Sequence, residues 1–338
     1  MEYATEAQVA EAQSQINRLS EALNQVLYGQ ETLIDFVING ILARGHILLE
    51  GLPGLGKTEL VKALSKTLVL ANKRVQFTPD LLPGDITGNP LLQERDGRRE
   101  FVFQPGPLFA NIVLADEINR ASPKTQSALL EAMQERRVTV LGESHELPNP
   151  FIVLATQNPI ELEGTYPLPE AQLDRFLFKL EVRRNSVAAI EKIVNSRELG
   201  VEPQVHAVLG EDHLQEIVST VRKVYLPEVV ANYIARLVDS THAGSCEASQ
   251  VVKFGASPRA ALSLASASKA RAVMNGRANA SFEDVKLVAP AVLRHRIVLD
   301  YSARIDGATS DSVIEALLAE VPFQTDATPR ALTPNSKS

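Results

Sequence analysis

The sequence predicts an α/β domain with a mostly parallel sheet, followed by an all-helical domain. Five short apolar runs lack strict alternation, which is typical of strands covered by helices on both faces; in chain order they are His46–Glu50, Arg74–Thr78, Ile112–Ala115, Phe151–Thr156 and Phe176–Val182. Helical patterns separate these runs, and this alternation of strand and helix indicates a parallel sheet. After Arg183 the patterns are helical only.

We therefore expect three segments. Residues 1–183 form a leading amphipathic helix over Glu6–Leu27 and the α/β domain, residues 184–323 a helical domain, and residues 324–338 a disordered tail rich in Thr, Pro and Ser. Two domains suit the length, since single cores stop growing at about 250–300 residues. The expected helices after residue 183 are Val187–Leu199, His213–Val224, Glu228–Ala243, Pro258–Asn275, Phe282–Arg294 and Ser312–Leu318.

The composition is ordinary for a soluble globular protein, with 45% hydrophobic and 22% charged residues. A formal net charge of −7 disfavours sequence-independent nucleic-acid binding, which depends on neutralising phosphates. Cys246 is alone in the sequence, which excludes an intrachain disulfide and a cysteine metal cluster. No apolar run approaches the roughly 20 residues of a membrane span, and the acidic N-terminus does not resemble a signal peptide. We expect a cytoplasmic protein.

The run Gly51-Leu52-Pro53-Gly54-Leu55-Gly56-Lys57-Thr58 matches the Walker A pattern G-x-x-x-x-G-K-[ST]. It stands between the first apolar run and a helical pattern over Glu59–Leu70, which is the strand, turn and helix context that the motif requires. The glycines let backbone N–H groups point at phosphate oxygens, and the helix start adds its positive dipole end. We expect nucleotide contacts from Gly51 through Glu59, with Lys57 on the phosphates and Thr58 on Mg²⁺.

Polar side chains end two of the later apolar runs. Ile112-Val-Leu-Ala leads into Asp116 and Glu117, so we expect Asp116 to hold Mg²⁺, through water, and Glu117 to act as general base. A kinase would not need the adjacent Glu, so the pair favours hydrolysis. Phe151-Ile-Val-Leu-Ala-Thr-Gln leads into Asn158, whose amide can orient water against the γ-phosphate. An Asn before Pro is also a common turn residue.

Two predicted hairpins interrupt the alternation of strand and helix. Leu91–Arg95 and Arg98–Phe103 flank Asp96-Gly97, a strong two-residue turn signal. A second pair of short strands turns at Gly142-Glu143. Neither hairpin is needed to build a nucleotide-binding sheet, so each is either a functional surface or a surface embellishment.

Taken together and in order, these motifs resemble those of an AAA+ ATPase, and within that class the MoxR group. The resemblance runs from about Val26 to about Arg296; it rests on Gly51–Thr58, Asp116–Arg120, Ala155–Pro159, Leu173–Phe176 and Gly255–Arg259. It implies a sheet with strand order 5-1-4-3-2, a helical lid, and a ring that usually has six subunits. The two hairpins correspond to an insertion into the second helix and to the hairpin before the sensor strand.

The resemblance also implies residue roles. Asn158 becomes the first sensor, and Arg175 becomes the arginine finger that reaches ATP bound by a neighbouring subunit. Arg259 becomes the second sensor in its own subunit, and Tyr28-Gly29-Gln30 corresponds to the segment near the adenine. Arg120 competes for the role in trans, because it also follows the carboxylate pair.

Structural alternatives remain open for two of these arginines. Arg175 can instead make a local ion pair with Asp174. Arg259 can instead be an exposed residue at a helix start, although a cation is unfavourable there.

The resemblance implies an ATP-hydrolysing, Mg²⁺-dependent ring motor that remodels protein clients or inserts cofactors into them, often with partners that carry von Willebrand A domains. Two other classes stay open. In a nucleic-acid translocase, Arg95, Arg98 and Arg99 at the first hairpin tip would touch phosphates, although neighbouring acidic residues make a solvated turn an equal interpretation. A magnesium-chelatase-like motor subunit would keep the same core but act with a metal-insertion partner.

Overall fold

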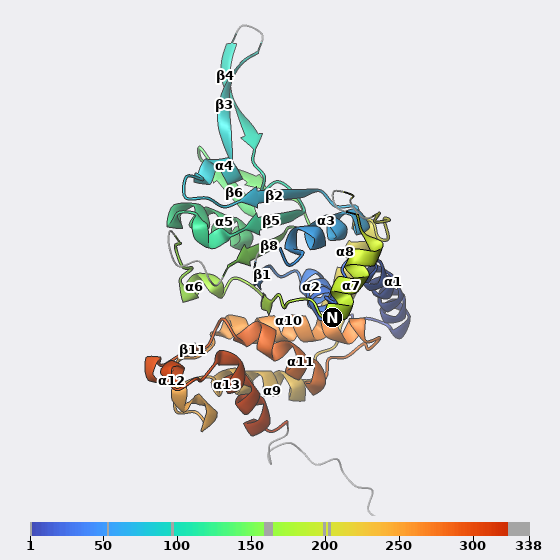
Figure 1. Ribbon diagram of the computed structural model, residues 1–338, viewed down its shortest axis with the longest axis vertical. Coiled ribbons are helices and arrows are strands. Elements are labelled where there is room, and N and C mark those ends of the chain that lie inside the picture. The colour runs from blue at the N-terminus through green and yellow to red at the C-terminus, as the bar shows by residue number, and fades with distance from the viewer. Residues whose placement is uncertain are drawn as a thin grey trace, which may run out of the picture. The chain divides into compact units, whose positions relative to one another are not determined.

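The computed structural model describes residues 2–52, 54–95, 98–158, 165–198, 201 and 204–323, and these pack into two compact units (Figure 1). The first unit comprises Met1–Val224 and Ala270–Ala278, and the second comprises Tyr225–Lys269 and Asn279–Ser338. Residues 184–224, which we expected in the helical domain, belong to the first unit, because α8 (Glu211–Lys223) packs against α1 and α2. The tail expected over 324–338 lies outside the described residues.

Within the described residues, five strands form the parallel sheet of the first unit. Their spatial order is β2 (Asn72–Gln76), β5 (Ile112–Asp116), β8 (Ile152–Gln157), β1 (Ile47–Glu50) and β9 (Phe178–Glu181). All four neighbouring pairs are parallel. Numbered along the chain, this is the order 5-1-4-3-2, so the expected topology is confirmed. The central strands β5, β8 and β1 are buried almost throughout, whereas β2 is an edge strand whose buried residue is Val75.

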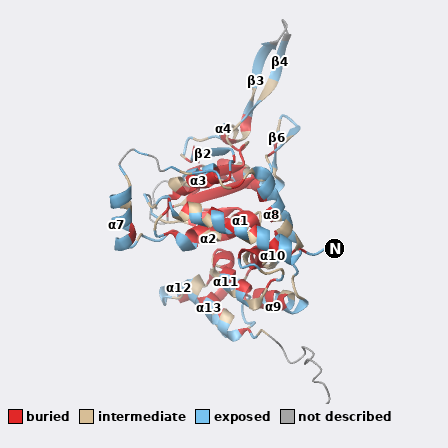
Figure 2. Cartoon of the chain, turned by 90° about the vertical axis from the view of Figure 1, so that its right-hand side faces the viewer, coloured by how far each residue is buried: buried red, intermediate tan, exposed pale blue. Residues whose placement is uncertain are grey.

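Helices cover the sheet of the first unit, and Figure 2 shows buried residues gathered along the sheet and the adjoining sides of α1 and α2. The longer helices are α1 (Glu6–Asn24), α2 (Glu31–Leu42), α3 (Lys57–Thr67), α5 (Pro123–Glu135), α7 (Val187–Ser196) and α8. The short ones are α4 (Pro83–Thr87), α6 (Glu170–Leu173) and the 3₁₀ turn η1 (Ile118–Arg120). As predicted, Ser122 caps α5 through its Oγ, which accepts from Thr125 N, and Pro123 is the first helical residue.

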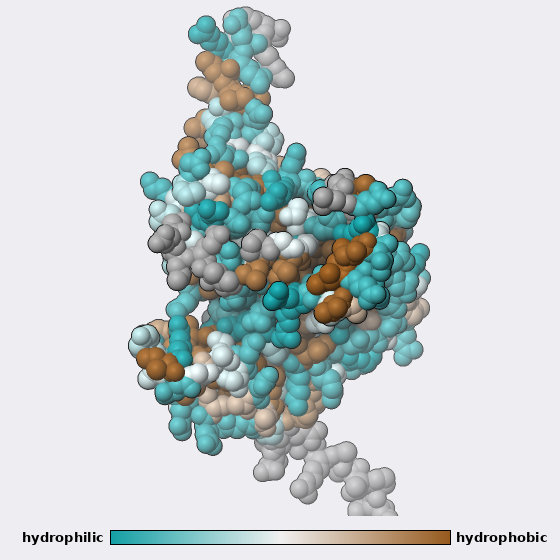
Figure 3. Space-filling model, in the orientation of Figure 1, coloured by the Kyte–Doolittle hydropathy of each residue, from teal (hydrophilic) through white to brown (hydrophobic). Residues whose placement is uncertain are grey.

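Two of these helices differ from the sequence expectation. We did not predict α2; its residues from Val37 to Leu42 are all buried, so this half shows no helical period, although Glu31 and Thr32 at its start are exposed. The helix expected over Val187–Leu199 is α7, and Leu199 lies outside the described residues. On α7 the side chains of Val187, Ile190 and Val194 are exposed and form the apolar stripe visible in Figure 3.

Both expected hairpins are present. β3 (Gly88–Arg95) pairs with β4 (Arg98–Pro105), and the ribbon projects from the sheet (Figure 1). Its turn at Asp96-Gly97 lies outside the described residues. Leu92 faces Phe101 across the strands, and both side chains are mostly exposed. At the base, a Cβ on Gly88 would lie 2.4 Å from the carbonyl oxygen of Gln104, which explains the glycine.

The second hairpin joins β6 (Arg137–Val140) to β7 (Glu143–Glu146). Its turn residues are Leu141 and Gly142, one position earlier than the expected Gly142-Glu143. Both have positive φ, at 52° and 84°, as a type I′ turn requires. The two hairpins touch through a stacked pair of rings, Phe103 and His145, whose centroids are 3.9 Å apart.

The second unit is built from α9 (Glu228–Asp239), α10 (Pro258–Met274, up to Lys269), α11 (Phe282–Leu293), α12 (Tyr301–Ile305) and α13 (Ser310–Glu320). The expected helical domain is confirmed, with one addition that we did not predict: β10 (Val252–Phe254) pairs with β11 (Val298–Leu299) in a small antiparallel sheet. Ser281 and Asp284 form the expected capping box of α11. In both units, no described helix has the length and apolar character needed to cross a membrane.

Candidate nucleotide-binding and hydrolysis site

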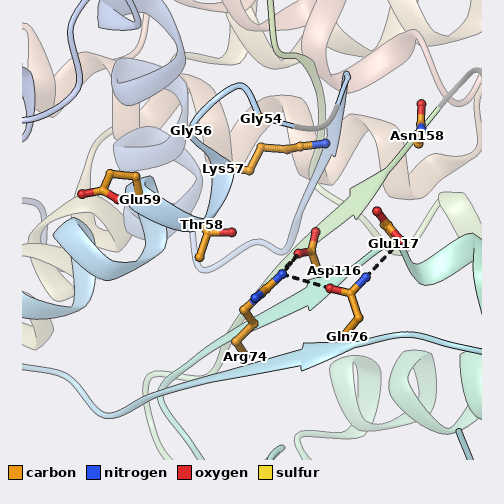
Figure 4. A pocket seen from close by; sticks show the side chains of 10 residues that line it. All are labelled: Gly54, Gly56, Lys57, Thr58, Glu59, Arg74, Gln76, Asp116, Glu117 and Asn158. Carbon is orange, nitrogen blue, oxygen red and sulfur yellow. Dashed lines mark hydrogen bonds and ion pairs between the residues drawn. The ribbon is translucent and has the colours of Figure 1, made fainter. Parts of the chain in front are cut away.

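A pocket of about 320 Å³ lies at the carboxyl ends of the sheet strands (Figure 4). Parallel strands end at the same edge of a sheet, so residues from distant segments converge there. The lining residues are Gly54, Gly56, Lys57, Thr58, Glu59, Arg74, Gln76, Asp116, Glu117 and Asn158. The structure therefore brings together the phosphate loop, the carboxylate pair and the sensor asparagine that the sequence predicted separately.

The loop before α3 has the backbone of a phosphate cradle. Gly54 and Gly56 have φ values of +81° and +85°, and a Cβ on either would meet nothing within 4 Å. Positive φ, rather than crowding, is what favours glycine here, and the loop curls around open space. Gly51 is different, since its Cβ would lie 2.9 Å from the carbonyl oxygen of Val182. Pro53, an expected contact, lies outside the described residues.

The start of α3 is suited to an anion. Its N-cap is Gly56, and no side chain caps the first N–H groups. Uncapped N–H groups at a helix start bind phosphate oxygens and add the positive end of the helix dipole. Lys57 and Thr58 follow at once, while Leu55 is half-buried and the side chain of Leu52 is exposed. The open cradle, the uncapped helix and the lysine together fit a nucleotide polyphosphate.

Lys57 is buried, and its Nζ donates to the carbonyl oxygen of Gly51 at 2.8 Å. Burial lowers the pKa of its amine, and the carboxylates of Asp116 and Glu117 act in the opposite direction. Figure 4 shows the amine pointing toward the side of the pocket where Glu117 and Asn158 lie. This position suits a cation that contacts the terminal phosphates.

Asp116 ends β5, and both of its carboxylate oxygens are engaged. Oδ1 accepts from Thr156 Oγ1 at 2.6 Å. Oδ2 accepts from Arg74, through Nη2 at 2.7 Å and Nε at 3.2 Å. A carboxylate beside the Thr58 hydroxyl is the oxygen-rich donor set that Mg²⁺ prefers, so the residues present fit that cation.

Glu117 has a left-handed backbone, with φ 57° and ψ 51°, a conformation that costs about 1–3 kcal/mol in a non-glycine residue. Its N–H donates to Thr156 Oγ1 at 2.8 Å. Its Oε2 accepts from Gln76 Nε2 and from Arg120 Nη1, each at 3.0 Å. The strained backbone is therefore held by the same threonine that holds Asp116, and it presents the carboxylate to the pocket.

Asn158 directly follows β8, is buried, and lines the pocket, as the sensor interpretation requires. Sequence analysis missed three residues that act on the carboxylate pair, namely Arg74, Gln76 and Thr156. A signal was available for the first two. Arg74 and Gln76 are two residues apart at the carboxyl end of β2, so their side chains lie on the same face of the strand. The register of β2 with β5 places Gln76 opposite Asp116.

Three arginines that were predicted to contact nucleotide remain. Among the described lining residues, neither Arg120 nor Arg175 is included. Arg175 is half-buried, and its Nη1 donates to the carbonyl oxygen of Leu130 at 2.7 Å, while Arg120 is exposed and bonds to Glu117. Arg259 is an exposed residue of α10 in the second unit. Their predicted contacts with nucleotide stay predictions.

The segment expected near the adenine lies at a second pocket of about 730 Å³. Tyr28 and Gly29 line it, together with residues of α1 and α7. Gln30 is buried and donates to Arg183 O at 3.2 Å and to Asn185 Oδ1 at 2.6 Å, which joins the start of α2 to the chain before α7.

Arg197 connects the two pockets, and sequence analysis did not identify it. Its guanidinium lies 5.9 Å from the ring centroid of Tyr28, and its Nη1 is 4.0 Å from Glu59 Oε1. It also donates to the carbonyl oxygen of Val26. One guanidinium therefore lies near a lining residue of each pocket, Glu59 of the first and Tyr28 of the second.

Comparison with known proteins agrees with this geometry. Residues 46–178 match the ATPase family associated with various cellular activities (AAA), and residues 247–317 match the AAA lid domain. The uncharacterized protein YeaC of Bacillus subtilis is 41% identical over 318 residues, covering 92% of this chain and 96% of that protein. Chaperone MoxR1 of Mycobacterium tuberculosis is 41% identical over 326 residues, covering 94% and 85%.

A solved structure has the same fold. The crystal structure of a protein from Cytophaga hutchinsonii, described as a candidate ATPase, superposes with a TM-score of 0.88 at 40% identity. The match covers 95% of this chain and 98% of that one. Together with the motifs in the pocket, these similarities show that the chain belongs to the MoxR group of the AAA ATPase family and hydrolyses ATP.

Proposed function

We propose that this ATPase is a ring-forming chaperone motor that remodels protein clients or inserts cofactors into them. The observation that carries the proposal is one pocket holding Lys57, Asp116 and Glu117 in a chain whose relatives include a protein named as a chaperone. Partners with von Willebrand A domains, a ring of six subunits and a cytoplasmic location follow from the family resemblance.

Binding rests on the loop and the start of α3. The backbone of Gly51–Glu59 holds the phosphates, and Lys57 contacts the β- and γ-phosphates. Thr58 and Asp116 hold Mg²⁺, which when bound neutralises charge on the phosphate oxygens. The adenine ring lies near Gly29 and Gln30, a placement supported by the second pocket, which Gly29 lines.

Hydrolysis rests on Glu117 and Asn158. Glu117 takes a proton from the attacking water, and its left-handed backbone keeps the carboxylate at the pocket. Asn158 orients that water through its amide. Gln76 and Arg120 donate to Oε2 of Glu117, which orients the carboxylate and leaves Oε1 for the attacking water.

Assembly completes the site. Arg175 acts on the ATP of a neighbouring subunit, and its position outside its own pocket supports this role. Arg120 is the second candidate for the same role. Arg259 contacts nucleotide from the lid of its own subunit. An arginine supplied in trans stabilises charge that develops on the transferred phosphoryl group.

Two variants test the site. Lys57→Ala should abolish nucleotide binding, because it removes a ground-state contact with phosphate. Glu117→Gln should bind nucleotide like the wild type and lose about 10²–10⁴ in turnover, because only the base is removed. Fluorescent-nucleotide binding and phosphate release measure the two effects. Wild-type turnover by Glu117→Gln would show that the base has been assigned to the wrong residue.

The cellular role needs a separate test. Affinity purification of the Glu117→Gln variant from its native host, with ATP present, should retain clients and partners in a complex that does not turn over. Lys57→Ala is the matched control, because it should not enter the ATP-bound state. A client enriched with the first variant and absent with the second supports the chaperone proposal, and equal recovery with both contradicts it.

A further inference from the structure

Arg74 has no part in the phosphate loop or the carboxylate pair, yet it lies in the pocket. It stands on β2, the edge strand, and its register partner on β5 is Leu114. Its guanidinium makes a forked contact with Asp116 Oδ2, at 2.7 and 3.2 Å, and Nη2 also donates to Gln76 Oε1 at 2.9 Å (Figure 4). Both donors converge on one oxygen and the arginine is half-exposed, so the pair is of the modest kind found at surfaces.

The two partners of Asp116 differ in how easily they can leave. Thr156 is completely buried, and its hydroxyl also accepts from the backbone of Glu117, so it is fixed in the core. Arg74 is 51% exposed, on a strand with a neighbour on one side, and its long side chain can turn into solvent. Arg74 is therefore the more easily displaced of the two partners.

We infer that Arg74 is a positioning residue that holds the Asp116 carboxylate and competes with Mg²⁺ for its negative charge. The inference rests on the proposed role of Asp116 as the residue that holds the metal. Guanidinium and Mg²⁺ are both cations, so binding of one weakens binding of the other at the same carboxylate.

The test measures how strongly Mg²⁺ strengthens nucleotide binding, without turnover. The dissociation constant of fluorescent ADP is determined in EDTA and in excess Mg²⁺. The constant in EDTA divided by the constant in Mg²⁺ gives the strengthening by the metal, and this ratio is compared between variants. Arg74→Gln should raise the ratio, by up to about fivefold, because a half-exposed ion pair contributes at most about 1 kcal/mol. The ratio of Arg74→Lys should lie between those of the wild type and Arg74→Gln, since lysine keeps the charge but not the two converging N–H donors.

Lys73→Gln is the matched control. It removes one positive charge from the same exposed strand, and alternation places its side chain on the opposite face from Arg74. Its ratio should equal that of the wild type. A second readout is Mn²⁺ bound at saturating ADP, followed by electron paramagnetic resonance, where Arg74→Gln should lower the midpoint concentration by the same factor.

Asp116→Asn separates failure of the inference from failure of the proposed metal role. If Asp116→Asn removes most of the Mg²⁺ effect and Arg74→Gln leaves the ratio unchanged, Asp116 holds the metal but Arg74 does not compete. If Asp116→Asn keeps the wild-type ratio, the metal assignment itself is wrong and the inference falls with it. If Lys73→Gln raised the ratio as much as Arg74→Gln, loss of any positive charge from this strand would explain the stronger Mg²⁺ effect, and the inference would be overturned.

Discussion

His46, at the start of the strand that leads into the phosphate loop, is expected to make this protein sensitive to mild acid. It is buried, its Nδ1 accepts from Val153 N at 3.0 Å, and its Nε2 lies 3.1 Å from the carbonyl oxygen of Met133. This pattern requires the neutral ring with the proton on Nε2. Burial, and secondly the Arg136 guanidinium, lower the pKa of His46 from 6.5 to about 4, against the bond to Met133.

The direction of the change in stability with pH follows from proton binding. Between pH 6.5 and about 4 the unfolded chain binds a proton at His46 and the folded chain does not, so stability is lost as the pH falls. At about 1.4 kcal/mol per pKa unit, the full loss approaches about 3 kcal/mol, and about 2 kcal/mol of it is reached by roughly pH 5. Protonation would also replace the acceptor for Val153 N with a second donor.

The assay is urea unfolding at about pH 7.5 and pH 5, followed by circular dichroism, on wild type and His46→Asn. Asparagine keeps an acceptor near Val153 N but does not titrate. The free energy of unfolding of the wild type should fall by about 2 kcal/mol more than that of His46→Asn. The control, His213→Asn, replaces an exposed histidine of α8 and should follow the wild type. Equal losses in His46→Asn and wild type would refute the argument.

The remaining predictions concern the site and the first hairpin. Mixing inactive Glu117→Gln and Arg175→Ala subunits should restore part of the ATPase activity, because some interfaces pair an intact base with an intact arginine; co-assembled mixtures without activity would exclude Arg175 in trans. Thr156→Val should cost about 1–3 kcal/mol, since it leaves buried partners on Asp116 and Glu117 unpaired, and an unchanged melting temperature would contradict this. Replacing exposed Leu92 and Phe101 with Ser should preserve the melting temperature and basal ATPase but reduce client-stimulated turnover; a large fall in melting temperature would show that the hairpin is structural.

The hairpin prediction has a physical basis in the ribbon itself. Leu92 and Phe101 are 55% and 68% exposed, so their apolar surface gains little from folding within this chain. The ribbon of β3 and β4 projects from the sheet, where a partner can reach it (Figure 1). Sequence analysis identified the same hairpin through its turn signal Asp96-Gly97 and named Arg95, Arg98 and Arg99 as phosphate contacts of a translocase; the side chains of Arg95 and Arg98 lie outside the described residues.

The sequence by itself determined the motifs whose residues are adjacent in the chain. The phosphate loop, the carboxylate pair and Ser122 before Pro123 were recognised because each function depends on residues adjacent in the chain. The strands were recognised because their burial appears as short apolar runs. The strand order came from the family resemblance, which carries tertiary information that no local pattern holds.

Only the tertiary structure decided which residues from distant parts of the chain come together. Arg74, Gln76 and Thr156 join Asp116 and Glu117 because the register of adjacent parallel strands brings their carboxyl ends together. Helix α2 escaped prediction because its second half, from Val37 to Leu42, is buried throughout and shows no helical period. Arg197 contacts Tyr28 and Glu59 across long stretches of chain. These contacts form only when the chain has folded, because side chains far apart in sequence leave no spacing by which to recognise them.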